Sequence, residues 1–180
     1  GSSGVQVLID TLDESTDPAT INMCIETLDA IGKSAKPACQ SIIKKLSHSE
    51  PIVRNSCYQA LKNIGSDSPK TSKFVIEKIM KSIKLEKNDY VVISMIEVLL
   101  QYPNKLEHYF LDLIQMINRS SPSVNAMLLL LLSELKVHES KTIRVFKKFL
   151  NSSQRQLSSV SALCLLEKKL DDLDQDELIE

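Results

Sequence analysis

A pattern of apolar and polar positions returns along the chain at a nearly constant interval. The segment DPATINMCIETLDAIG at 17–32 is echoed by EPIVRNSCYQALKNIG at 50–65, and the matching positions are 33 residues apart. The same register continues through 91–102, 124–135 and 157–168. The leucines that mark it are Leu28, Leu61, Leu99, Leu132 and Leu165. A period in this range is typical of supersecondary units that stack on one another.

A second apolar pattern precedes the repeated segments. It consists of two adjacent apolar residues and a third one turn later, as in Leu8, Ile9 and Leu12. Residues at i, i+1 and i+4 share one face of a helix, so each unit is predicted to be a pair of helices. First helices are expected near 5–13, 36–47, 70–85, 105–118 and 140–150, and second helices near 18–31, 51–64, 89–102, 122–135 and 154–169.

Residues that begin and end helices fall at these boundaries. Asp17, Ser68 and Ser121 each precede a proline, so a capping oxygen stands before a residue whose missing N–H costs nothing at a helix start. Gly32 and Gly65 follow second helices, where we expect the left-handed conformation of a helix C-cap. The prediction is an all-α fold, a solenoid of about five antiparallel helix pairs.

The two ends of the chain differ from the repeats between them. Gly1 to Gly4, with the sequence GSSG, is interpreted as a cloning remnant, and the helix pairs are expected to span 5–170. Because the first helix of the first unit is short, the chain is interpreted as an excerpt of a longer array or as one with a short cap. The acidic tail at 171–180 is expected to be disordered, to pair with a basic face, or to cover the last unit with Leu173, Leu178 and Ile179.

These helix pairs resemble HEAT repeats, within the broader HEAT and armadillo class. The resemblance rests on the period, on a proline in the turn inside a pair, as at Pro18, Pro51 and Pro122, and on Glu50-Pro51-Ile52-Val53-Arg54, which opens a second helix. It covers the chain from Val5 to Leu170. The family's Val-Arg pair after the proline is kept only in this second unit, and the equivalents of Arg54 are Ile21, Val92, Asn125 and Ser158. The resemblance implies a right-handed superhelix with the second helices on its concave surface, and a role as adaptor, transport receptor or assembly scaffold.

Charge is balanced overall but segregated along the chain. The net charge of -1 creates no general attraction to nucleic acid or membrane. Residues 1–32 nevertheless carry six acids and no Lys or Arg, whereas 33–87 carry twelve bases and four acids. Such blocks are either solvated helix faces or docking zones. The longest wholly apolar run, at 126–132, is too short to cross a membrane.

The cysteines and histidines do not form a recognisable metal or catalytic motif. Cys24 and Cys57 share one repeat position, so the four cysteines, at 24, 39, 57 and 164, are interpreted as small core residues of a protein in the cytoplasm or another reducing compartment. The histidines, His48, His108 and His138, are expected at helix ends or on exposed faces. No Gly-rich phosphate loop, HExxH, GxSxG or EF-hand pattern is present, so we predict no catalytic residue, cofactor or metal.

Two charged clusters leave a binding role open. Asp10, Asp13, Glu14 and Asp17 are explained by the preference of helix starts for acids, with a cation site as the alternative. One side of the predicted 70–85 helix carries a lysine stripe, consisting of Lys70, Lys73, Lys81 and Lys84. These lysines are either solvated or an anion-binding surface for nucleic acid or anionic lipid, with salt-sensitive affinity.

The second helices change character along the chain. The residue two positions before each marker leucine reads Glu26, Gln59, Glu97, Leu130 and Leu163, and the residue after it reads Asp29, Lys62, Leu100, Ser133 and Leu166. Polar residues therefore give way to apolar ones on one helix face. Three interpretations are open: a tighter core or a covering tail, a groove that binds a partner's amphipathic helix or extended peptide, or self-association.

The function favoured by this pattern is a non-enzymatic scaffold or adaptor that binds another protein along the second-helix surface. The residues predicted to bind the partner are Glu26, Asp29, Gln59, Lys62, Glu97, Leu130 and Leu163. The alternative is an anion-binding solenoid that uses the lysine stripe.

Overall fold

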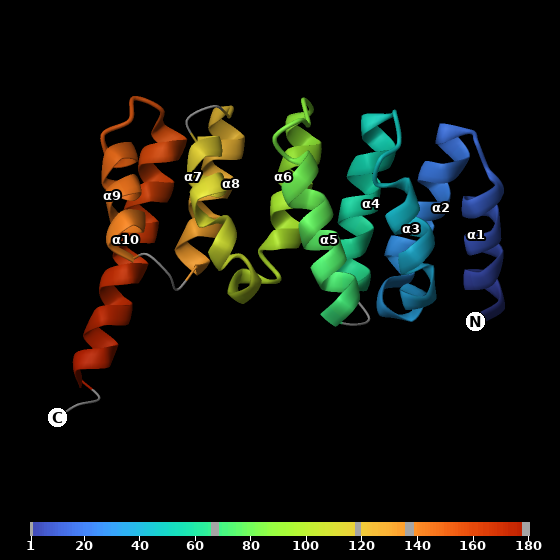
Figure 1. Ribbon diagram of the computed structural model, residues 1–180, viewed down its shortest axis with the longest axis horizontal. Helices are drawn as coiled ribbons and strands as arrows, with labels where there is room; N and C mark the ends of the chain where they lie inside the picture. The colour runs from blue at the N-terminus through green and yellow to red at the C-terminus, as the bar shows by residue number, and fades with distance from the viewer. Residues whose placement is uncertain (1, 66–68, 118–119, 136–138, 178–180) are drawn as a thin grey trace. The chain divides into compact units, whose positions relative to one another are not determined.

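The computed structural model describes residues 2–65, 69–117, 120–135 and 139–177 (Figure 1). In these ranges the chain forms α-helices and short 3-10 helices and no β-strand, which confirms the all-α prediction for them. None of the helices described has the length and apolar character needed to cross a membrane. The chain divides into two compact units, residues 1–101 and 102–180.

Unit 1 contains six α-helices and one 3-10 segment in the residues that the structure describes. In order these are α1 (Ser2–Glu14), α2 (Pro18–Ile31), the 3-10 segment η1 (Gly32–Ala38), α3 (Cys39–Lys45), α4 (Pro51–Ile64), α5 (Pro69–Ser82) and α6 (Asp89–Leu99). α2 packs against α4 and α4 against α6, while α1 packs on α2 and α3 on α4 (Figure 1). The marker leucines Leu28, Leu61 and Leu99 are buried between these helices, as their common register predicts.

The second helices α2 and α4 begin and end where the sequence predicts, whereas α6 begins as predicted but ends at Leu99 instead of 102. Asp17 caps α2, because its side chain accepts a hydrogen bond of 2.8 Å from the backbone N–H of Thr20. Gly32 and Gly65 have φ of 65° and 80°, a region that favours glycine. Their ψ angles of -138° and 166° are extended, however, so the prediction of a left-handed helical cap was wrong in ψ. These glycines redirect the chain instead of adding a final turn.

The first helices differ more from the prediction: α7 begins at Phe110 instead of 105, and a proline interrupts the helix expected at 36–47. Pro37 lies inside η1, so the segment expected as one helix at 36–47 is a 3-10 turn followed by the seven-residue α3. Proline has no N–H to continue an α-helical ladder, and 3-10 turns accommodate such positions. At the start of the chain, α1 begins at Ser2 and includes most of the segment interpreted as a remnant.

Unit 2 contains the short 3-10 segments η2 (Pro103–Lys105) and η3 (Glu107–Tyr109), followed by α7 (Phe110–Ile117), α8 (Pro122–Glu134), α9 (Glu139–Leu150) and α10 (Arg155–Glu177). α8 packs on α7 and α10, and α10 packs on α9. Ser121 caps α8, with its hydroxyl accepting from the N–H of Val124 at 3.5 Å. The core of this unit therefore lies around α8.

The last repeat departs from the predicted register. Leu132 on α8 is fully buried, but Leu165 on α10 is only half-buried. The buried stripe of α10 runs instead through Leu157, Ser161 and Cys164, which share one helix face that α8 and α9 cover. A common register predicts similar burial of the five marker leucines, and this prediction was wrong at the fifth.

α10 continues well beyond the predicted end at 169. Residues 171–177 of the acidic tail are helical and continue α10, so disorder, one of the three alternatives left open for the tail, does not describe this part. The predicted cap residues Leu178 and Ile179 lie outside the described residues, and so does Ser68, the predicted cap of α5.

Candidate functional site

The neighbouring second helices α4 and α6 enclose a groove of about 520 Å³. α4 contributes Ile52, Asn55 and Gln59, which are spaced to lie along one helix face, and α6 contributes Tyr90 and Ile93 from the other side. The remaining lining residues are Glu50, Pro51, Asn88 and Ser94. The side chains of two repeats are thus needed to form this site.

The rim of the groove exposes large apolar side chains. Tyr90 is 78% exposed and Ile52 is 55% exposed. Met23, on the adjacent helix α2, is also exposed. Single exposed apolar residues are common on protein surfaces. Two of them lining one groove instead indicate a surface whose burial by a partner would lower the free energy.

Hydrogen bonds connect the two walls of the groove. The amide nitrogen of Gln59 donates to Glu97 Oε2 and to Ser94 Oγ, both at 2.8 Å. Ser94 Oγ donates in turn to Asn55 Oδ1 at 2.8 Å, and Lys62 Nζ lies 3.0 Å from Glu97 Oε2. These polar groups fix the spacing of α4 and α6 and neutralise the Glu97 carboxylate.

The structure brings together three of the polar residues predicted to bind a partner, namely Gln59, Lys62 and Glu97. Asp29 belongs to the next contact along, since its Oδ1 accepts from Asn63 Nδ2 at 2.9 Å and so joins α2 to α4. Glu26 is exposed and accepts from Asn22 in its own helix at 2.8 Å. The predicted row is therefore mainly a set of hydrogen bonds between helices, and the exposed contact residues lie beside it.

The sequence analysis missed the apolar rim. Ile52 and Tyr90 occupy the same repeat position, where the first unit has Ala19. An apolar residue at the second position of a helix, outside the buried stripe, was the available signal. The polar row that the sequence predicted, by contrast, lies toward the other end of each helix.

The apolar residues predicted in unit 2 are exposed. Leu163 is 58% exposed, Leu130 is 36% exposed, and Leu166 is exposed too, whereas Leu129 is fully buried. α8 packs on α10 through this buried side, where Cys164 Sγ lies 3.9 Å from the carbonyl oxygen of Leu129. A tighter core therefore does not account for Leu163. Second helices of both units expose apolar side chains.

Within the acidic cluster, Asp13 makes contacts with α3 of the same chain. Asp13 accepts hydrogen bonds from Ser41 Oγ at 3.0 Å and from Lys44 Nζ at 3.1 Å. Burial acts to raise the pKa of Asp13, but these hydrogen bonds and the lysine charge outweigh it and hold the pKa below its usual value. Within the described ranges, no group of three or more His, Cys, Asp or Glu side chains could hold a metal ion.

The cysteines are buried and free, as predicted for core residues. Burial raises the pKa of the Cys57 thiol to about 12, so it remains protonated at neutral pH and is a poor nucleophile. His48 lies at the helix end expected for it, where its Nδ1 accepts from the N–H of Glu50 at 3.1 Å. His108 is exposed, and His138 falls in a range without a described structure.

Arg54 makes the strongest polar contact described between repeats. Its guanidinium donates two hydrogen bonds to the Glu86 carboxylate, at 2.8 and 2.9 Å, and two more to the carbonyl oxygens of His48 and Ser49. Burial acts to raise the pKa of Glu86, but the hydrogen bonds from Arg54 and from the backbone N–H of Asn88 lower it further than burial raises it. This contact joins the start of α4 to the turn before α6.

The lysine stripe is exposed along α5 and just beyond its end. Lys70, Lys73, Lys81 and Lys84 are all exposed, and Lys73 Nζ lies 4.0 Å from Glu77. Lys70 also lines a groove between α3 and α5. Anion binding by this stripe stays a prediction.

Comparison with protein-family models gives no match for this chain, and comparison with curated proteins gives none either.

Proposed function

We propose that this protein is a non-enzymatic scaffold, an α-solenoid of the HEAT type, that binds a segment of another protein along its second helices. The observation that carries the proposal is the groove between α4 and α6, where Tyr90 and Ile52 are exposed beside a network of amides and carboxylates. Stacked second helices, as in the contacts of α2 with α4 and of α4 with α6, support the solenoid.

The chemistry of the groove fits a peptide segment. Tyrosine is enriched among residues that dominate binding energy, because it combines a large apolar ring with a polar hydroxyl. The amide nitrogen of Asn55 can donate to a backbone C=O, and the amide oxygen of Gln59 can accept from a backbone N–H, of an extended or helical segment. The exposed leucines of α8 and α10 supply a second apolar surface of the same kind in unit 2.

Binding is favoured over catalysis by the way the polar groups are arranged. Glu97, which accepts a hydrogen bond from the lining residue Gln59, is also paired with Lys62, so its charge stabilises the helix contact. A general acid or base would need a proton-transfer group directed at a substrate position.

Photo-crosslinking tests the proposal with a matched control. A photoreactive phenylalanine analogue replaces Tyr90 in one variant and Leu85 in another, since both side chains are 78% exposed. We expect the variant at 90 to capture a protein partner from native cell extract, and excess unlabelled chain to compete. Equal capture at 90 and 85, or capture that unlabelled chain does not reduce, would overturn the proposal.

A further inference from the structure

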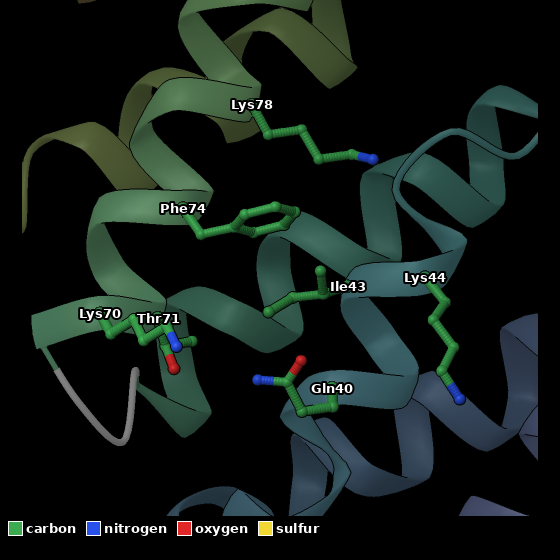
Figure 2. A pocket seen from close by; sticks show the side chains of 7 residues that line it. All are labelled: Gln40, Ile43, Lys44, Lys70, Thr71, Phe74 and Lys78. Carbon is green, nitrogen blue, oxygen red and sulfur yellow. The ribbon is translucent and has the colours of Figure 1, made fainter.

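A second groove, of about 530 Å³, lies between α3 and α5 in unit 1 (Figure 2). α3 contributes Gln40, Ile43 and Lys44, and α5 contributes Lys70, Thr71, Phe74 and Lys78. None of these residues lines the groove between α4 and α6, so the two sites can be altered independently.

Phe74 gives this groove an apolar wall that is open to water. The side chain is 52% exposed, and its ring extends across the groove toward Ile43, whose own side chain is buried (Figure 2). When a second apolar group covers a phenylalanine that has half of its surface in water, the burial of that surface is favourable. The space beside Phe74 and Ile43 therefore favours one bulky apolar side chain.

The charge around this apolar wall is positive. Lys70 and Lys78 lie one turn before and one turn after Phe74 on the same face of α5, and Lys81 continues that face. Lys44 lines the groove with its aliphatic stem, while its ammonium group points away and pairs with Asp13 at 3.1 Å (Figure 2). The described lining contains no carboxylate to balance Lys70 and Lys78.

We propose that this groove binds an acidic peptide segment of a partner protein, with one leucine or aromatic side chain against Phe74 and Ile43 and flanking carboxylates near Lys70 and Lys78. The positive charges of Lys70 and Lys78 favour carboxylates on the peptide, and the half-exposed ring of Phe74 provides the apolar contact. Single-stranded nucleic acid is disfavoured, because successive bases need successive aromatic side chains and this groove has one. A bilayer is disfavoured because the apolar surface is recessed between two helices.

The probe is a fluorescein-labelled peptide, LDDLDQDELIE, which copies residues 170–180 and has the required alternation of acids and leucines. Fluorescence polarisation measures its binding to the full chain. We expect Phe74→Ser to weaken binding at least about tenfold, the loss typical of a central apolar anchor. The double variant Lys70→Glu, Lys78→Glu should weaken it similarly, and affinity should fall as salt rises.

The controls distinguish binding at this groove from non-specific attraction of an acidic peptide and from binding at the α4–α6 groove. Leu85→Ser, which removes an exposed apolar side chain outside this groove, and Tyr90→Ser, in the α4–α6 groove, should leave peptide affinity unchanged. A peptide with its leucines replaced by serine should bind weakly. Circular dichroism verifies that each variant keeps its helix content.

Three results would overturn the proposal. The first is no measurable binding of the acidic peptide to the wild-type chain. The second is binding that Phe74→Ser leaves unchanged. The third is binding of single-stranded DNA or phosphatidylserine vesicles that depends on Phe74 as strongly as peptide binding does. Failure of the proposed function at Tyr90 would leave all three measurements interpretable, because the two grooves share no lining residue.

Discussion

Arg54 and Glu86 illustrate how a single pair can hold two repeats together. Their bidentate contact is largely shielded from water, with 16% and 7% of the two side chains exposed. Bidentate pairing fixes orientation as well as distance, so the start of α4 and the turn before α6 are held in one geometry. Only one repeat has an arginine at this position, so the contact cannot run the length of the chain.

Glu86→Ala should lower the free energy of unfolding by about 3 kcal/mol at neutral pH, because it leaves the Arg54 charge buried without its partner. Since the folded-state pKa of Glu86 lies below its ordinary value of 4.5, the contribution is present above that pH and is lost as the pH falls through the folded-state pKa. Urea unfolding between neutral and acidic pH measures this. A Glu86→Ala variant whose acid sensitivity equals that of wild type would contradict the assignment.

The substitution Leu163→Lys tests whether Leu163 is a surface residue or a core residue. Because Leu163 is 58% exposed, the substitution should change the unfolding free energy by no more than about 0.5 kcal/mol and should weaken partner binding. Leu132→Ala, at a fully buried position, should cost about 2–5 kcal/mol. Thermal unfolding of both variants measures the difference. A large loss of stability in Leu163→Lys would assign this leucine to the core.

At the scale of elements, the second helices were predictable and the first helices less so. A proline at the start and a glycine at the end define α2 and α4 locally, so their bounds at 18–31 and 51–64 were confirmed. The first helices depend on how proline is accommodated, as at Pro37, where a 3-10 turn replaces the first part of the expected helix. Periodicity alone does not distinguish these two solutions.

Gly65→Ala should destabilise the protein by about 1–3 kcal/mol, the cost of holding a side chain at a backbone conformation reserved for glycine. Nothing lies within 4 Å of the position a Cβ would take, so the loss reflects backbone strain and not a clash. Chemical denaturation measures it, with Gly4→Ala as control, because Gly4 lies in helix α1 without a positive φ. Equal stability of the Gly65→Ala variant and wild type would contradict the strained geometry.

At the scale of the whole molecule, the groove between α4 and α6 depends on contacts between repeats, which the sequence of a single repeat does not reveal. Ile52 and Tyr90 belong to different helix pairs, and only the packing of α4 on α6 places them on one groove. The sequence therefore predicted the polar row through Gln59 and Glu97 but not its pairing across helices. The repeat register singled out Leu130 and Leu163 but left a core position and an exposed position open, and the structure shows that both side chains are exposed.

Stacking also predicts how the chain tolerates truncation. A fragment of residues 1–101, which forms one compact unit, should remain helical and unfold cooperatively, whereas residues 1–32 alone should lose most of their helix. An isolated helix pair has no neighbour to bury its apolar face. Circular dichroism with urea titration measures both fragments. Stable helix in the shorter fragment would show that a single pair suffices.

The central claim is that a partner binds along the second helices, and its most direct test is the affinity of the crosslinked partner for two matched variants. Isothermal titration of the purified partner should show binding at least about tenfold weaker for Tyr90→Ser than for wild type. A loss of this size is typical of aromatic side chains that become buried in an interface. Leu85→Ser, which removes an equally exposed side chain, should leave the dissociation constant unchanged. Equal weakening by both substitutions, or by neither, would contradict the account.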